Sequence, residues 1–205
     1  MKKKLMIAVG ALSLWAGVAR ADGSAELIQR SYDSEATGRL ADSLSVLDQL
    51  PPGRRDMYVV TLRRAWLLYR LARNAEAVEV YGRAIALAPN AVEPRLGVLL
   101  PHLALRRWSD VENQARAILK LDPANYLAQL RMAFALYNLQ RYAESTALYR
   151  RLSELYPSDV EVRSGLGWAL LKAGKYPEAA TEFRHILDVA PRNELAKEGL
   201  KAAGG

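Results

Sequence analysis

The chain has 205 residues, of which 51% are hydrophobic and 25% are charged, and its formal net charge at pH 7 is +7. It contains no cysteine, which excludes disulfide bonds, thiol nucleophiles and a lipid-modified cysteine. Acidic residues are interspersed among the basic ones and no long basic run occurs. This argues against nucleic-acid binding, which needs a concentrated positive footprint.

The first 21 residues have the three parts of a secretory signal peptide. Lysines at 2–4 precede an apolar stretch over 5–18, and 19–21 form a small-x-small cleavage site. The apolar stretch is shorter than the roughly 20 residues that span a bilayer, so we expect cleavage after Ala21, the alternative being an uncleaved N-terminal anchor. Cleavage removes four of the 29 basic residues and no acidic one, which lowers the net charge to +3. The signal resembles bacterial ones and predicts a periplasmic or secreted chain without stable membrane insertion.

The rest of the chain is organised by four equally spaced prolines, Pro89, Pro123, Pro157 and Pro191. A fixed spacing of this length, about 34 residues, indicates one supersecondary unit stacked several times, because a single unit cannot bury its apolar face. The register divides the chain into five blocks, residues 24–57, 58–91, 92–125, 126–159 and 160–193. Residues 194–205 are rich in good helix formers and predict a short polar helix that caps the last block.

Two sites in each block have the side-chain sizes that a pair of antiparallel helices needs. The small-residue site of the first helix holds Ser31, Ala65, Leu99, Ala133 and Gly167, and the bulky site of the second helix holds Leu47, Tyr81, Ala115, Tyr149 and Phe183. Leu99 departs from the first rule. Prolines 51 and 52 predict that the second helix of block 1 ends early, and Pro101 predicts a bend in the first helix of block 3.

Block 160–193 has the fullest set of recurring residues, Leu166, Gly167, Leu170, Gly174, Tyr176, Ala179, Phe183 and Pro191. This pattern closely resembles the tetratricopeptide repeat (TPR), a helix–turn–helix unit of about 34 residues. The resemblance covers residues 24–193 and is fullest from residue 126 onward. It implies an all-α fold in which residues 22–205 form a single domain, a TPR-type α-solenoid: a right-handed superhelix of about five helix–turn–helix repeats plus a C-terminal capping helix.

The resemblance also implies a binding site, because the first helices of successive TPR units line a concave groove that holds peptides or partner helices. Carried over position by position, the groove would be lined by the aromatic residues Tyr32, Trp66, Tyr69, Phe134, Tyr137 and Trp168 and by the polar residues Arg70, Asn138 and Lys172. We expect two aromatic patches, Trp66 with Tyr69 and Phe134 with Tyr137 and Trp168, separated by an aliphatic middle. The alternative is that these aromatic residues belong to the core.

No pattern indicates catalysis or a cofactor. The two histidines, His102 and His185, have no metal-ligand spacing, and no phosphate-binding loop or nucleophile motif occurs. We therefore expect no enzyme activity, no metal and no cofactor. The predicted function is that of an exported adaptor or scaffold that binds a partner protein or peptide, and resemblance to bacterial TPR proteins suggests a cell-envelope, secretion or polysaccharide-export assembly. Two alternatives stay open: a scaffold that self-associates through its own repeats, and a polysaccharide-binding module.

Overall fold

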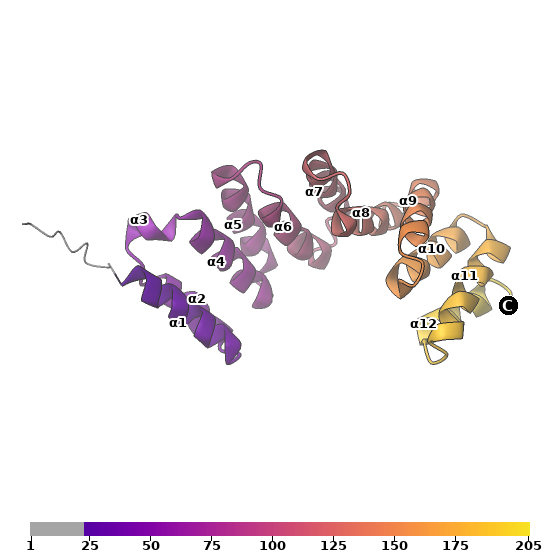
Figure 1. Ribbon diagram of the computed structural model, residues 1–205, viewed down its shortest axis with the longest axis horizontal. Helices are drawn as coiled ribbons and strands as arrows, with labels where there is room; N and C mark the ends of the chain where they lie inside the picture. Colours follow the sequence, from indigo (N-terminus) through magenta and orange to yellow (C-terminus); the bar gives the residue numbers. More distant parts are fainter. Residues whose placement is uncertain (1–22) are drawn as a thin grey trace, which may run out of the picture.

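The computed structural model describes residues 23–205, and the predicted signal segment lies outside the described residues (Figure 1). Residues 23–205 form twelve helices and no strand, so the predicted all-α fold is confirmed. The helices follow one another in an elongated array from α1 to α12 (Figure 1). None of the helices in this part of the chain is long and apolar enough to cross a membrane.

The helices have the following bounds: α1 Ser24–Ala36, α2 Leu40–Leu47, α3 Pro52–Arg55, α4 Tyr58–Arg70, α5 Asn74–Leu87, α6 Glu93–Ala104, α7 Trp108–Leu121, α8 Tyr126–Asn138, α9 Tyr142–Leu155, α10 Val160–Lys172, α11 Tyr176–Val189 and α12 Glu194–Ala202. Each of the five blocks contains one pair of packed helices, α1 with α2, α4 with α5, α6 with α7, α8 with α9 and α10 with α11. The interval between the recurring prolines therefore marks a helical hairpin.

The recurring prolines explain where the second helices end. Helices α5, α7, α9 and α11 each stop two residues before a proline, at Leu87, Leu121, Leu155 and Val189. The residue before a proline is disfavoured in the helical conformation, and proline itself has no N–H to donate. The prolines thus fix the length of the second helices at 14 residues.

The first block differs from the others as predicted. Helix α2 has only eight residues and ends before Pro51, and Pro52 begins the four-residue helix α3.

Helix α6 of the third block runs through the buried Pro101 to Ala104, and the N–H of Leu105 donates to the carbonyl oxygen of Pro101 at 3.0 Å. The proline is thus accommodated inside the helix.

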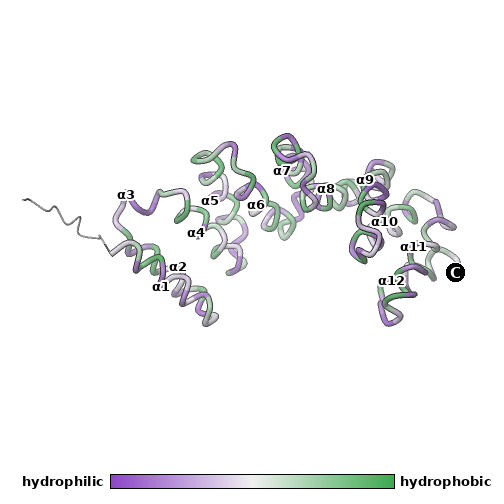
Figure 2. The backbone as a smooth tube through the Cα atoms, viewed as in Figure 1, coloured by the Kyte–Doolittle hydropathy of each residue, from purple (hydrophilic) through white to green (hydrophobic). Residues whose placement is uncertain are grey.

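The core consists of apolar side chains on the faces where helices pack. In Figure 2, hydrophobic and hydrophilic residues alternate along each helix, as expected of amphipathic helices. The departure at Leu99 is compensated by Ala115 at the bulky site of the same block, and both residues belong to one buried cluster, with exposures of 2% and 0%. Total side-chain volume between the two helices is thus conserved while its distribution is exchanged.

Rings at the bulky site also pack against the following block. A Cβ atom added to Gly97 would lie 2.3 Å from the ring of Tyr81, and the same distance separates an added Cβ at Gly165 from the ring of Tyr149. The two glycines follow their rings at the same interval in sequence, so the first helix of the next block lies directly on the ring. Close approach of two helices therefore depends on a ring and a glycine in register.

Candidate functional site: the groove formed by the first helices

The structure places the nine predicted groove residues outside the fully buried core. Tyr32 and Phe134 are 46% and 39% exposed, and Arg70 and Lys172 are also exposed. Partial burial is seen for Trp66, Tyr69, Tyr137, Asn138 and Trp168. These side chains are therefore accessible at least in part from solvent, and their role in binding stays a prediction.

A cavity of about 280 Å³ lies at the N-terminal end of this surface. It is lined by residues of α1, α4 and α6, the first helices of three successive blocks: Tyr32, Glu35, Tyr58, Val59, Leu62, Arg63, Trp66 and Glu93. We call it the groove pocket. Two of the predicted residues, Tyr32 and Trp66, belong to it, and the exposed side chain of Val59 adds an aliphatic surface beside them.

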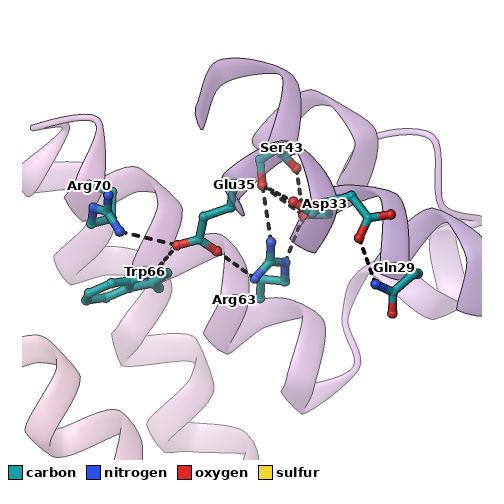
Figure 3. A network of polar contacts seen from close by, with 8 residues as sticks. Gln29, Asp33, Glu35, Ser43, Arg63, Trp66 and Arg70 are labelled. Atoms are coloured by element: carbon teal, nitrogen blue, oxygen red, sulfur yellow. Dashed lines mark hydrogen bonds and ion pairs between the residues drawn. The ribbon is translucent and has the colours of Figure 1, made fainter. Parts of the chain in front are cut away.

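A buried arginine organises the floor of the groove pocket (Figure 3). Arg63 donates from Nε to Ser31 Oγ at 2.8 Å and from Nη2 to Ser43 Oγ at 3.2 Å, and its Nη1 contacts Glu35 Oε2 at 3.0 Å. Only 4% of its side chain is exposed, and the guanidinium carbon lies 3.5 Å from the centre of the Tyr32 ring. Because a buried charge needs compensating partners, this network ties the first block to the second.

Glu35 connects that network to the predicted aromatic pair. Its Oε1 accepts the indole N–H of Trp66 at 2.7 Å and lies 3.4 Å from Arg70 Nη1, as drawn in Figure 3. The Arg70 guanidinium lies 5.4 Å from the centre of the Trp66 ring, and the rings of Trp66 and Tyr69 are 5.8 Å apart. The first predicted patch is therefore a packed unit, in which a carboxylate holds the indole ring in one orientation.

The second predicted patch is arranged differently. Among the described residues, the ring contacts of Phe134, Tyr137 and Trp168 are with Trp108, Tyr142 and Phe183, at centroid distances of 5.7, 5.6 and 5.4 Å. The three rings thus lie against neighbouring helices, without a ring contact to one another in this part of the chain. The side-chain amide of Asn138 donates to the carbonyl oxygen of Phe134 at 2.8 Å, so its N–H is engaged within α8.

Six pocket residues were not predicted as site residues: Glu35, Tyr58, Val59, Leu62, Arg63 and Glu93. One signal for Glu35 is present in the sequence, since the same site of the other blocks holds Tyr69, Leu103, Tyr137 and Leu171. A single carboxylate among apolar residues at this site indicates that it pairs with a particular side chain of the protein. The hydroxyl of Tyr58 donates to Glu93 Oε2 at 3.1 Å, and burial together with this carboxylate raises the pKa of Tyr58.

The rest of the described chain offers no obvious chemistry. No group of three or more His, Asp or Glu side chains within residues 23–205 is placed to hold a metal ion. His102 is buried with its Nδ1 3.8 Å from Asp110 Oδ2, and burial lowers its pKa.

Paired helices stacked around an open row of first helices define a helical-repeat solenoid. Residues 130–194 and 60–91 each match a family model described as tetratricopeptide repeat. The chain is a member of the tetratricopeptide-repeat family, as its sequence pattern predicts. A comparison with curated proteins found no match.

Solved structures agree with this assignment. A tetratricopeptide repeat protein from Parabacteroides merdae has a TM-score of 0.78 at 20% identity, over 87% of this chain and 71% of that one. A fragment of MamA from Desulfovibrio magneticus has the same TM-score at 15% identity, over 84% and 97%. A TPR protein from Thermus thermophilus has a TM-score of 0.61 at 16% identity, over 87% and 97%. At these identities the likeness is one of fold.

Proposed function

We propose that the protein is a noncatalytic adaptor that holds a segment of a partner protein along its first helices, with the groove pocket as one anchor point. The observation that carries this proposal is the orientation of Trp66, whose indole N–H is bound to Glu35 while Val59 and Tyr32 remain exposed beside it. A ring that is already fixed loses little freedom when a ligand packs on it, so more of its contact energy is available for binding.

Export belongs to the same proposal and is supported by the three-part signal pattern of residues 1–21. We place the mature chain in the periplasm or outside the cell, within a cell-envelope, secretion or polysaccharide-export assembly. Fractionation of the native cells followed by N-terminal sequencing tests this placement. A mature chain that begins at Asp22 in the exported fraction is expected, whereas an intact N-terminus in the cytoplasmic fraction would contradict it.

Binding is tested by crosslinking the protein in its native cells and identifying what it carries. We expect the double variant Trp66→Ala/Trp168→Ala to lose most of the crosslinked partner while it keeps the helical circular dichroism signal, because two anchor rings worth about 2 kcal/mol each are removed. Tyr176→Ala is the matched control, since this ring is 52% exposed and lies at the start of α11, apart from the predicted groove residues. Unchanged capture by the double variant would refute the groove as the binding surface.

The other two classes predicted from the sequence give different results. A self-associating scaffold shows a mass that rises with concentration in light scattering, and a polysaccharide-binding module changes its tryptophan fluorescence when oligosaccharide is added. The adaptor that we propose shows neither.

A further inference from the structure

The blocks of this chain repeat in pairs, because residues 58–125 and 126–193 share features that single blocks do not. Blocks 2 and 4 have in common Tyr58 and Tyr126, Arg63 and Arg131, and Tyr69 and Tyr137; blocks 3 and 5 have in common Val92 and Val160, Glu93 and Glu161, and Gly97 and Gly165. The members of each pair stand two proline intervals apart. The chain thus has a second period, which is twice the helical hairpin.

Helix packing follows the longer period too. Tyr81 and Tyr149, which are also two intervals apart, lie on Gly97 and Gly165 at the same short distance. Blocks 1 and 3 have no ring at the bulky site, which holds Leu47 and Ala115. The residue that follows them at the interval of Tyr81 and Gly97 is an arginine instead of a glycine, Arg63 after Leu47 and Arg131 after Ala115. Helix α6 therefore approaches α5 as α10 approaches α9, and a ring–glycine contact also forms the last junction, where Phe183 lies on Gly199.

The groove pocket has a counterpart under this longer period. Its six residues on α4 and α6 correspond in order to those on α8 and α10: Tyr58 to Tyr126, Val59 to Leu127, Leu62 to Leu130, Arg63 to Arg131, Trp66 to Phe134 and Glu93 to Glu161. The chemical type is kept at every position, but burial is exchanged at two of them: Leu62 is partly exposed and Arg63 is buried, whereas Leu130 is buried and Arg131 is partly exposed. The second residue of α4 and the second residue of α8 are both aliphatic and similarly accessible, with exposures of 44% for Val59 and 47% for Leu127.

We propose that these are two related subsites for one ligand, a polypeptide segment with two large apolar side chains and a basic residue beside the one that enters the groove pocket. This inference rests on the proposed function and adds the chemistry of the partner. Helix α4 packs on α6, and α6 on α8. Packed helices lie about 8–10 Å apart, which puts the subsites about 20 Å apart. An extended segment covers that distance with about six residues.

The basic residue follows from a difference in charge between the subsites. In the first subsite, Arg63 forms an ion pair with Glu35. The exposed Glu93 has only the Tyr58 hydroxyl as a polar partner among the described side chains. In the second, the carboxylate of Glu161 lies 2.6 Å from Arg131. A carboxylate without a cationic partner beside an apolar surface is complementary to lysine or arginine next to an apolar side chain. The difference gives the ligand a direction.

Synthetic peptides provide the test. The probe is a fluorescein-labelled peptide with Leu-Lys and Leu-Ser separated by a spacer of Gly and Ser that is long enough to reach both subsites, titrated into the mature chain by anisotropy. We expect it to bind at least tenfold more tightly than either peptide in which one leucine is replaced by serine, because the second contact is made at high effective concentration. Equal affinities, or no binding by any of the three peptides, would overturn the proposal.

Matched variants locate the two contacts. Val59→Asp and Leu127→Asp are each expected to reduce the affinity of the two-leucine peptide at least tenfold, to the level of a one-leucine peptide. Both positions lie in the first turn of a helix, where aspartate is compatible with the helix dipole. Leu195→Asp, at the same place in α12 and 60% exposed, is the control and is expected to change nothing. An effect of only one of the first two variants would contradict paired subsites.

The direction of the ligand has its own measurement. Moving the lysine beside the other leucine is expected to weaken binding several-fold, and Glu93→Gln is expected to remove that difference; a difference that survives Glu93→Gln would contradict the role of the carboxylate. The outcome for the adaptor itself is separate. If the Trp66→Ala/Trp168→Ala variant loses its native partner while the peptides show no advantage of two anchors, the adaptor stands and the paired subsites fail.

Discussion

At the scale of single residues, the turns inside the hairpins contain backbone strain. The residue in the turn after each first helix has a positive φ: Gly38 at 78°, Ala72 at 58°, Arg106 at 54°, Gln140 at 62° and Gly174 at 76°. The next N–H then donates back to a carbonyl in the last turn, for example Arg141 N–H to Leu136 O at 2.9 Å. Only glycine adopts this conformation without cost, so three of the five turns are strained.

Replacing one strained residue by glycine is therefore expected to stabilise the fold. Gln140→Gly is predicted to raise the free energy of unfolding by about 1 kcal/mol, since relief of the left-handed strain exceeds the added entropy of the unfolded chain. Urea denaturation followed by circular dichroism measures it. The control is Ala143→Gly, in the first turn of α9, which is predicted to lower the free energy by about 1 kcal/mol or less. Destabilisation by Gln140→Gly would contradict the argument.

Titration of His102 predicts a pH dependence of stability. Burial is the main cause that lowers its pKa below the usual 6.5; Asp110 acts in the opposite direction, and Arg107 lowers it further. The folded state therefore favours the neutral ring, and this stabilisation is complete above pH 6.5 and is lost as the pH falls through the lower folded pKa. Urea midpoints are expected to fall between about pH 7 and pH 5 and to fall less in His102→Leu. Identical pH profiles would contradict the prediction.

A second group titrates in a separate range. Burial raises the pKa of Glu112, but hydrogen bonds from Arg116 and Arg141 outweigh it and hold the pKa below its usual 4.5. Its contribution is present above pH 4.5 and is lost at lower pH. The interval from about pH 5 to 7 thus isolates His102 from Glu112.

At the scale of helices, contact between a ring and a glycine decides how closely successive blocks approach. Gly82 of α5 and Gly97 of α6 lie on neighbouring helices, yet an added Cβ meets the Tyr81 ring at Gly97 and nothing within 4 Å at Gly82. The same substitution is therefore expected to have opposite effects at the two positions.

Gly97→Ala is predicted to lower the free energy of unfolding by about 2 kcal/mol, because the buried ring must move from a packed position. Gly82→Ala, on the open face of α5, is predicted to raise it by about 0.5–1 kcal/mol through helix propensity. Thermal and urea unfolding of both variants give the comparison. Combining Gly97→Ala with Tyr81→Leu is expected to recover part of the loss, and absence of any recovery would show that the ring is not the cause.

Hairpins were predictable from sequence because prolines, small residues and bulky residues recur at fixed intervals along the chain. The short α2 followed from Pro51 and Pro52 in the same way. The network around Arg63 was not predictable, since its acceptors come from α1 and α2, and no local periodicity relates them to α4. The separation of Phe134, Tyr137 and Trp168 was missed for a similar reason: repeat position fixes which side a residue faces, whereas ring contacts depend on the neighbours of each helix.

At the scale of the whole molecule, α12 covers the end of the array. Phe183 and Ile186 of the last block are fully buried, Gly199 of α12 lies on the Phe183 ring, and Leu200 packs against the same cluster. Lys201 stands at the site that holds a small residue in four of the five blocks, so a further second helix would meet a charge there. Helix α12 thus completes the apolar packing on one side and presents polar groups on the other.

Removal of residues 194–205 is predicted to lower the free energy of unfolding by about 3 kcal/mol, since the Phe183 ring and its neighbours become exposed to water. The shortened chain is also expected to bind a dye for apolar surface and to form larger species in light scattering. Deleting only residues 204–205 is the control and is expected to cost about 0.5 kcal/mol or less. Equal stability of the full and shortened chains would mean that α12 is not a cap.

The alternation of Tyr81–Gly97 and Ala115–Arg131 junctions sets a rule for changing the length of this molecule. Adding a copy of residues 58–125 after Asn125 brings every new junction into a combination that the native chain already contains, whereas duplicating block 2, 3 or 4 alone sets an arginine against a tyrosine ring or a glycine against an alanine. Within blocks 2–4, growth and shortening of this scaffold are therefore expected to occur in pairs of hairpins, whereas block 5 can be added or removed alone because Phe183 already packs on a glycine.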